Sequence, residues 1–323
     1  MAEPSQEIRW LEVKINSDGE IAEALAEVLG RFVSNGVVVE SETVFNPQSQ
    51  ENEPTGGMTV FGYLAVDDQL EEKRHKLEEA LWHLSQINPI TPAQYRPIKD
   101  QDWMAAWKEH YQPISIGENL LIMPAWATSK AVGERVVVRI NPAMAFGTGT
   151  HPTTQLCLRL LERHSTSGEP IIDVGCGSGI LSIAALHLGA AHALAVDVDG
   201  QAVTSTMENA GLNEISPTVL EAGKGSVEEI LTGRFSITQA PLVLVNILAP
   251  IIVRLLGEGL ADLVSPGGRL LLSGILIDQE PEVRQSAEEA GFNLVERLTD
   301  NDWVGLAMVK RDKKTKGQRE RIS

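Results

Sequence analysis

Ile171-Ile172-Asp173-Val174-Gly175-Cys176-Gly177-Ser178-Gly179 is the stretch of this chain that decides its fold. Apolar residues lead into three glycines at alternate positions, and an amphipathic segment, residues 180–188, follows. This order predicts a buried strand, a tight turn and the start of a helix, which together open a nucleotide-binding α/β unit. Glycine lets a backbone pass close to a ligand, and a helix N-terminus offers N–H groups that have no partner inside the helix.

The spacing of the glycines argues against a dinucleotide cofactor. The dinucleotide fingerprint is Gly-x-Gly-x-x-Gly/Ala, and its last position falls on Ile180 when counted from Gly175 and on Ser182 when counted from Gly177. A Rossmann dehydrogenase is therefore disfavoured. The pattern Asp-x-Gly-x-Gly-x-Gly instead resembles the first motif of S-adenosylmethionine-dependent methyltransferases.

A second acid stands where such a site needs one. Residues 193–197 predict the next buried strand, which ends in Asp197. An acid at this strand end accepts hydrogen bonds from ribose hydroxyls, and Asp199 is the second candidate for that role. Cys176 has no neighbouring base in the sequence, so we expect a small buried turn residue and not a nucleophile.

Composition limits the class of protein. The chain has 323 residues, of which 43% are hydrophobic and 22% charged, which suggests two globular domains. No run of about 18 apolar residues predicts a membrane span, and the polar N-terminus does not resemble a signal peptide. The two cysteines form neither a disulfide framework nor a zinc site, so we expect a cytoplasmic protein without a metal. The net charge of −17 disfavours nucleic acid as the main partner.

Residues 1–98 predict a small α+β domain with the order of a ferredoxin-like split βαβ. The expected strands cover residues 8–15, 36–40, 58–66 and 94–98, and the expected helices cover residues 21–32 and 77–84. Residues 46–57 are polar and contain proline and glycine, which predicts a mobile hairpin loop.

Residues 99–117 predict a linker with a short helix, whose aromatic side chains pack between the domains or serve as a hinge. Residues 118–310 then alternate strand and helix. Beyond short strands at residues 120–123 and 135–140, the expected strands are residues 170–174, 193–197, 218–221, 242–246, 268–275, 292–298 and 305–309. The expected helices are residues 179–188, 201–210, 227–231, 251–263 and 281–290. This alternation predicts an α/β fold with a doubly wound, mostly parallel seven-stranded sheet.

Two more segments carry polar groups near the predicted strand ends. Residues 146–154 (FGTGTHPTT) form a polar turn before a helix, where hydroxyl and N–H groups can face a ligand. His151 in this turn is a scaffold residue or a general base, and the lack of an evident acid partner favours the scaffold. Asn246 ends a strand at the place where amino-methylating enzymes carry an Asn/Asp-Pro-Pro-Tyr/Phe motif, and of this motif the chain keeps only the amide. By this resemblance, the side-chain oxygen of Asn246 would accept a hydrogen bond from an attacking amine and aim the lone pair of that amine at the methyl carbon.

The segments 146–154, 173–181 (DVGCGSGIL) and 246–249 (NILA) together resemble the ribosomal protein L11 methyltransferase family (PrmA). The similarity covers nearly the whole chain in order and is weakest over residues 1–90. It includes Asp102-Trp103 and Trp107-Lys108 in the linker, and Trp303 with Gly305 near the end. It implies a class I methyltransferase sheet behind a ferredoxin-like domain.

The resemblance also implies roles. Contacts to S-adenosylmethionine would come from Thr154, Gly175, Gly177, Asp197 and Asn246, and Asn246 would be the catalytic residue. A loop over the methionine end of the cofactor would hold Phe146, Gly147 and Thr148. The N-terminal domain would grip the ribosomal protein, and the linker would let it present lysine side chains and the N-terminal amine in turn.

The sequence departs from the family pattern in two places. Asn141 stands where an acid is expected, and residues 218–241 are weakly patterned, so that Glu221 and Glu228 are both candidates for the acid that contacts adenine.

Other functions remain open at this point. A methyltransferase acting on RNA needs a basic face, which the net charge disfavours, and one acting on a small molecule is a further alternative. A non-catalytic ribosome-binding protein would not need Asn246. The basic residues 311–323 are a solvated tail or a contact with ribosomal RNA, and we expect a monomer without membrane contact.

Overall fold

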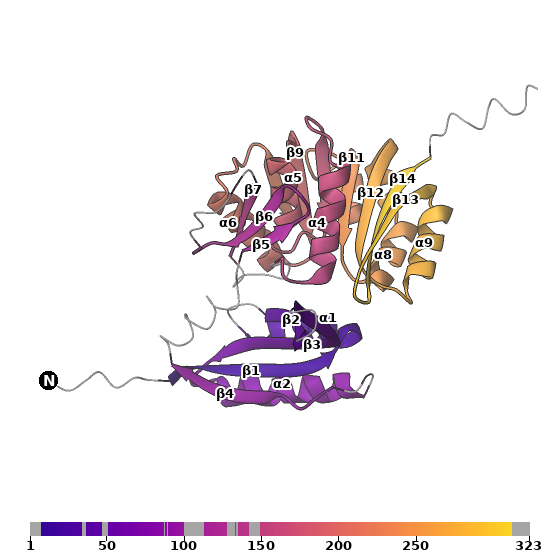
Figure 1. Ribbon diagram of the computed structural model, residues 1–323. Coiled ribbons are helices and arrows are strands. Elements are labelled where there is room, and N and C mark those ends of the chain that lie inside the picture. Colours follow the sequence, from indigo (N-terminus) through magenta and orange to yellow (C-terminus); the bar gives the residue numbers. More distant parts are fainter. Residues whose placement is uncertain are drawn as a thin grey trace, which may run out of the picture. The chain divides into compact units, whose positions relative to one another are not determined.

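The computed structural model describes residues 8–33, 37–46, 51–86, 88, 90–99, 113–127, 133, 135–141 and 149–311. The chain divides into two compact units, which are Met1–Pro113 with Asn141–His151, and Ile114–Ile140 with Pro152–Ser323 (Figure 1). Most of the predicted linker, the loop residues Phe146, Gly147 and Thr148, and nearly all of the basic tail lie outside the described residues. The four-part division into residues 1–98, 99–117, 118–310 and 311–323 stays a prediction.

The N-terminal unit consists of one antiparallel sheet and two helices. Its elements are β1 (Ile8–Asp18), α1 (Gly19–Gly30), β2 (Val37–Asn46), β3 (Glu51–Ala65), α2 (Leu70–Ser85) and β4 (Gln94–Lys99). The strands lie in the order β2-β3-β1-β4. The alternating residues Val13 and Ile15 of β1 pack with Leu25 of α1 and Leu77 of α2 in one buried cluster, so both helices cover the same face of the sheet.

The predicted mobile loop at residues 46–57 is wrong for most of its length. Strand β2 continues to Asn46, and β3 already begins at Glu51, which pairs with Asn46. Pro54 is tolerated because it pairs with Thr43 of β2 only, whereas the pairing of β3 with β1 begins at Gly57. The sequence prediction took proline and glycine as signs of a loop. In the structure they lie in the first part of β3, where β2 is the only described neighbouring strand.

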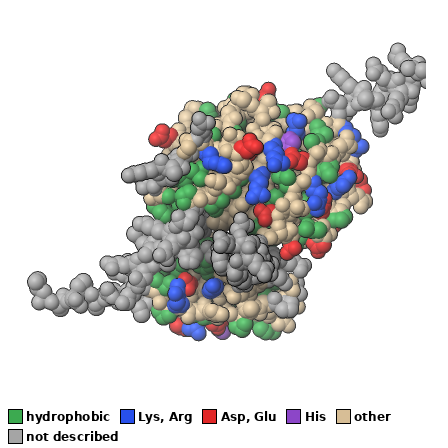
Figure 2. Space-filling view, viewed as in Figure 1, with side chains coloured by type: hydrophobic (Ala, Val, Ile, Leu, Met, Phe, Trp, Pro, Cys, Tyr) green, Lys and Arg blue, Asp and Glu red, His purple; other side chains and the backbone are tan. Residues whose placement is uncertain are grey.

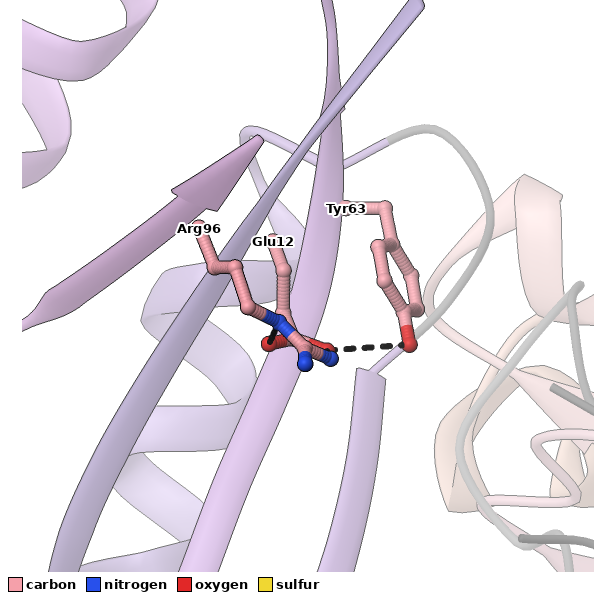
Figure 3. Close-up of polar contacts among 3 residues, drawn as sticks. All are labelled: Glu12, Tyr63 and Arg96. Atoms are coloured by element: carbon pink, nitrogen blue, oxygen red, sulfur yellow. Dashed lines mark hydrogen bonds and ion pairs between the residues drawn. The ribbon is translucent and has the colours of Figure 1, made fainter. Parts of the chain in front are cut away.

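A polar cluster ties the three adjacent strands β3, β1 and β4 of this unit together (Figure 3). Glu12 of β1 stands opposite Tyr63 of β3 on one side and Arg96 of β4 on the other. Arg96 donates two hydrogen bonds to the Glu12 carboxylate, from Nε at 3.0 Å and from Nη2 at 3.1 Å, and the Tyr63 hydroxyl donates a third at 3.4 Å. Glu12 alternates with Val13, so this cluster lies on the sheet face opposite the helices.

The second unit is built on a seven-stranded sheet. Its strands are β8 (Pro170–Val174), β9 (His192–Asp197), β10 (Leu220–Lys224), β11 (Ala240–Asn246), β12 (Val264–Leu276), β13 (Phe292–Asp300) and β14 (Trp303–Lys310). They lie in the order β10-β9-β8-β11-β12-β14-β13, and only the pairs that involve β14 are antiparallel. The prediction of an α/β fold with a large central sheet is confirmed.

Helices cover both faces of this sheet (Figure 1). They are α4 (Pro152–His164), α5 (Ile180–His187), α6 (Gly200–Leu212), α7 (Val227–Leu231), α8 (Ala249–Gly257) and α9 (Glu280–Glu289). In β8, Ile171 belongs to the buried cluster with residues of α4 and α5, whereas Ile172 belongs to the cluster with residues of α8 and α9. Burial on both faces explains why the strands of this half are almost continuously apolar.

Several boundaries of the second unit differ from the prediction, among them the start of β12 at Val264 in place of residue 268. The helix expected over residues 251–263 is interrupted at Gly259, whose φ of 103° ends α8 and leads into a 3₁₀ turn, Leu260–Leu263. The strand expected at residues 218–221 lies slightly later, as β10.

A separate small sheet is formed by β5 (Ile114–Ile116), β6 (Leu120–Pro124) and β7 (Val136–Ile140). None of the helices that the structure describes combines the length and the apolar character needed to cross a membrane.

Candidate active site

The predicted site residues meet at one edge of the seven-stranded sheet. Val174, the last residue of β8, pairs with Val196 of β9 on one side and with Val245 of β11 on the other. The next residues along the three strands, Gly175, Asp197 and Asn246, therefore follow at the same carboxyl edge. The strand order also reverses between β8 and β11, which is the place where open α/β sheets bind their ligands.

The turn after β8 requires glycine at each alternate position. Gly175, Gly177 and Gly179 have φ values of 78°, 54° and 77°, a region that side chains disfavour. The Gly175 N–H donates to the carbonyl oxygen of Val196 at 2.8 Å, which ties the turn to β9. A Cβ on Gly175 would lie 2.4 Å from Cγ2 of Ile247, so the space above this glycine holds the residue that follows Asn246.

The carboxylate of Asp197 is held by backbone N–H groups. Gly177 N–H donates to Oδ2 at 3.0 Å, and Asp199 N–H donates to Oδ1 at 2.9 Å. Each carboxylate oxygen has capacity for a further bond from a ligand hydroxyl. The Asp199 carboxylate instead caps α6, because its Oδ1 accepts from Gln201 N–H at 2.9 Å. The geometry thus favours Asp197 over Asp199 as the ribose acceptor.

Asn246 is in contact with the first turn of α4. Its Nδ2 donates to Oγ1 of Thr154 at 3.4 Å, and Thr154 is fully buried. Because the amide nitrogen faces Thr154, the carbonyl oxygen Oδ1 occupies the other branch of the side chain and can accept a hydrogen bond. The structure therefore brings together two residues that are 92 positions apart in the sequence.

Asp173 is a candidate that the sequence reasoning did not place in the site. It is fully buried in β8, and its Oδ2 accepts a hydrogen bond from Ser182 Oγ at 2.7 Å. Its Oδ1 has no partner among the residues that the structure describes. Burial raises the pKa of this carboxyl group from 3.8 to about 7. The signal was present in the sequence, as an acid inside an apolar strand directly before the glycine turn.

Two residues with reactive side chains are structural in character. Cys176 is buried, its Sγ lies 3.3 Å from Oγ1 of Thr206, and burial raises the pKa of its thiol above the ordinary range. It is a turn residue, as expected, and a poor nucleophile. His151 is only 3% exposed, and burial lowers its pKa to about 4. The imidazole is therefore neutral at pH 7.

Glu221 and Glu228 are the two acids that the sequence offers as contacts to adenine. Glu221 Oε2 accepts from Ser236 N–H at 3.0 Å, and Glu221 pairs with Leu194, three residues before the edge at which Lys224 pairs with Asp197. This position disfavours Glu221 as an adenine contact, and Glu228 lies in the first turn of α7.

The C-terminal glycine of the resemblance also has a packing role. A Cβ on Gly305 of β14 would lie 3.2 Å from Cβ of Leu156 in α4, so this glycine allows the helix to approach the sheet closely. Trp303 and Leu156 belong to one small buried cluster. Over the described ranges, no group of His, Cys, Asp and Glu side chains is placed to hold a metal ion.

Comparisons with known proteins point to one family. The model of the ribosomal protein L11 methyltransferase (PrmA) family matches residues 9–311. A relative from Chloroflexus aurantiacus, named ribosomal protein L11 methyltransferase, is 38% identical over 322 residues, which cover 93% of this chain and 98% of the relative. A relative of the same name from Citrifermentans bemidjiense is 40% identical over 313 residues, with coverage of 93% and 98%.

A crystal structure of a ribosomal protein L11 methylase from Lactobacillus delbrueckii subsp. bulgaricus superposes with a TM-score of 0.56 at 33% identity. The alignment covers 62% of this chain and 100% of that chain. The match of the family model over most of the sequence, and relatives of similar length at this identity, lead to one conclusion. The chain belongs to the ribosomal protein L11 methyltransferase (PrmA) family.

Proposed function

We propose that this protein is a methyltransferase that transfers methyl groups from S-adenosylmethionine to lysine side-chain and N-terminal amines of ribosomal protein L11. Family membership supports the reaction and the substrate. The observation that carries the proposal is the position of Asn246, whose amide oxygen stands as an acceptor at the same sheet edge as the glycine turn and Asp197. An amine needs such an acceptor beside the cofactor to be held in line with a methyl group.

The residues at this edge fit S-adenosylmethionine. Asp197 has acceptor capacity for ribose hydroxyls, and the glycine turn leaves its backbone open to a close approach. Oδ1 of buried Asp173 has no partner among the described residues, which suits a cationic group, and the cofactor carries an ammonium group at its methionine end. When bound, the cofactor supplies an electrophilic methyl group on a positively charged sulfur. The contacts of Thr154, Gly175 and Gly177 with it, and the loop formed by Phe146, Gly147 and Thr148, remain part of this proposal.

The protein's own contribution to the reaction is positioning. Only a neutral amine has the lone pair that attacks, and a lysine amine with a pKa near 10.4 is mostly protonated at pH 7. Desolvation beside positive charge lowers the pKa of that amine and raises its neutral fraction. Asn246 Oδ1 then accepts a hydrogen bond from the amine and sets the direction of its lone pair.

We assign the departing proton to water. His151 has a pKa of about 4, which is far below that of the amine, so its imidazole is a weak acceptor for this proton. We therefore propose that the amine loses its proton before attack and that no dedicated base takes part.

The architecture supports a finer assignment. We assign the N-terminal unit to the ferredoxin-like folds, because its sheet order β2-β3-β1-β4 and its order of elements are those of the split βαβ motif. We assign the second unit to the class I methyltransferases. The N-terminal unit would grip the ribosomal protein. Both cysteines, Cys157 and Cys176, are unpaired and buried, which suits a cytoplasmic protein.

Charge distribution favours a protein substrate over RNA. Figure 2 shows positive and negative side chains interspersed on the visible face of the larger unit. Several described arginines are also paired with carboxylates: Arg159 with Asp300, Arg163 with Glu296, and Arg297 with Glu280. A continuous basic surface for nucleic acid would need unpaired cations.

The test is a methyl-transfer assay with purified full-length protein and labelled S-adenosylmethionine. Ribosomal protein L11, other ribosomal proteins and ribosomal RNA are offered separately, and the products are resolved by intact mass. We expect stepwise gains of one methyl mass on L11 only. Asn246→Ala should bind the cofactor but transfer slowly, and Asn246→Asp, which keeps an acceptor oxygen, should retain more activity. Cofactor binding without mass gain on L11, or label on RNA, would overturn the proposed substrate.

A further inference from the structure

Strand β12, which pairs with β11, places Ser273 and Gly274 beside Asn246 and the residue that follows it. In the parallel pairing of β11 with β12, Asn246 stands opposite Ser273, which is fully buried. The pairing of β12 with β14 is shifted between Leu272 and Ile275, so Ser273 and Gly274 lie in an irregular part of the strand. Irregular positions of this kind redirect side chains, and they occur often beside active sites.

Ser273 connects this strand to the helix that carries Thr154. Its Oγ donates a hydrogen bond to the carbonyl oxygen of Thr153 at 2.9 Å, and both residues are fully buried. Thr153 immediately precedes Thr154, whose Oγ1 accepts from Asn246 Nδ2. One hydroxyl therefore fixes the first turn of α4 at the point where that turn contacts the amide of Asn246.

The residue after Asn246 is confined on two sides. Gly274 has a φ of 82°, and a Cβ there would lie 2.2 Å from the carbonyl oxygen of Ile247 and 2.7 Å from its carbonyl carbon. On the other side, Cγ2 of Ile247 fills the space above Gly175. The backbone of Ile247 thus lies close against Gly274 of β12, and its side chain lies close against Gly175. A change at Ser273, the neighbour of Gly274, therefore acts on a closely packed segment that includes the residue after Asn246.

We propose that Ser273 is a positioning residue for methyl transfer, acting through the first turn of α4 and Thr154 to set the orientation of the Asn246 amide. This inference rests on the proposed role of Asn246. We assign no contact with substrate or cofactor to Ser273, because it is fully buried and its hydroxyl is bonded to Thr153. Ser273 would affect the rate of methyl transfer by fixing the position of the Asn246 amide. Such positioning matters, since a displacement of about 1 Å in a reacting group costs on the order of 100-fold in rate.

The experiment compares Ser273→Ala with Ser205→Ala in the full-length protein. Ser205 is a matched control, since it is also buried in the second unit and its hydroxyl makes no hydrogen bond within the part of the chain that the structure describes. We measure the single-turnover rate of methyl transfer, the Kd for S-adenosylmethionine and the Tm of each variant. Ser273→Ala should lose on the order of 10-fold to 100-fold in rate, whereas its Kd should rise by a much smaller factor, since Thr154 is also a proposed cofactor contact. Ser205→Ala should keep the wild-type rate.

A double-mutant cycle with Asn246→Ala separates positioning from general stability. If Ser273 acts through Asn246, Ser273→Ala should add little to the loss already caused by Asn246→Ala. Additive losses, or an unchanged rate in Ser273→Ala, would overturn the inference and leave the role of Asn246 intact. Full activity in Asn246→Ala would instead overturn the proposed mechanism. A parallel rise in Kd and fall in rate for Ser273→Ala would also reject a positioning role.

Discussion

The carboxyl group of Asp173 should hold a proton in the cofactor-free protein until the pH approaches 7. Asp173 is fully buried, one oxygen is bonded to Ser182, and the other has no partner in the described part of the chain. Burial raises its pKa from 3.8 to about 7, and the negative charge of Asp197 adds to the rise. The perturbation is Asp173→Asn, which removes the titration and keeps an oxygen that can accept from Ser182.

The size of the expected pH effect on stability follows from the shift in the pKa of Asp173. A rise of about three units, at about 1.36 kcal/mol per unit, means that ionising Asp173 costs about 4 kcal/mol more in the folded than in the unfolded chain. The unfolded chain releases this proton above about pH 4, whereas the folded chain holds it to about pH 7. The stability contributed by this group is therefore full below about pH 4 and is lost as the pH rises to about 7, by up to about 4 kcal/mol. Asp173→Asn should lack this loss.

Infrared spectroscopy measures the protonation directly. The wild type should show the carbonyl stretch of a buried protonated carboxyl group at about pH 6, and the band should vanish by about pH 8 and be missing in Asp173→Asn at both values. Urea unfolding over the same range, followed by a probe in the second unit, measures the energetic consequence. A wild type without the band at about pH 6, or variant and wild-type stabilities that change in parallel with pH, would refute the reasoning.

Three further predictions concern the candidate site. Asp197→Ala should weaken cofactor binding by about 1–3 kcal/mol, because hydrogen bonds to the ribose are lost. Asp199→Ala should lower the thermal stability and leave the affinity for the cofactor unchanged. If calorimetry shows that Asp199→Ala loses affinity and Asp197→Ala does not, the roles of the two acids are exchanged. Cys176→Ala should retain the wild-type rate of methyl transfer in a steady-state assay, because its thiol stays protonated, and an inactive but folded variant would contradict this. The single-turnover rate should rise with pH through the neutral range as the amine loses its proton, and a flat profile would show that deprotonation does not precede attack.

Much of the second unit could be predicted because its strands are buried on both faces. The predicted strand at residues 170–174 coincides with β8, and those at residues 193–197 and 242–246 lie within one or two residues of β9 and β11. Continuous apolar runs closed by glycine or polar residues give a strong local signal. The N-terminal hairpin was predicted, but the length of its two strands was underestimated because proline and glycine were taken as loop residues, although strand pairing accommodates them.

The site was predictable in part, for a related reason. Gly175, Asp197 and Asn246 each end an apolar strand, and the carboxyl ends of neighbouring parallel strands share one edge. The apolar strand around Asp173 indicated that this acid is buried, but its protonation depends on how completely the folded chain encloses it. The contact of Ser273 with Thr153 was not predictable, because it joins segments 120 positions apart and no local pattern in the sequence encodes it.

Ile247 shows why a motif identifies a site better than it explains it. The sequence alone attributes Gly175 to the need of a ligand for close approach to the backbone. In the structure, the space that a side chain on Gly175 would fill is already taken by Ile247, and the peptide of Ile247 lies against Gly274 on the other side. The glycine turn and the Asn246 loop are therefore one packed unit. Gly175, which the motif assigns to the cofactor, therefore also packs against the residue that follows Asn246, to which we assign the orientation of the amine. On this proposal, cofactor binding and amine orientation depend on the same packing.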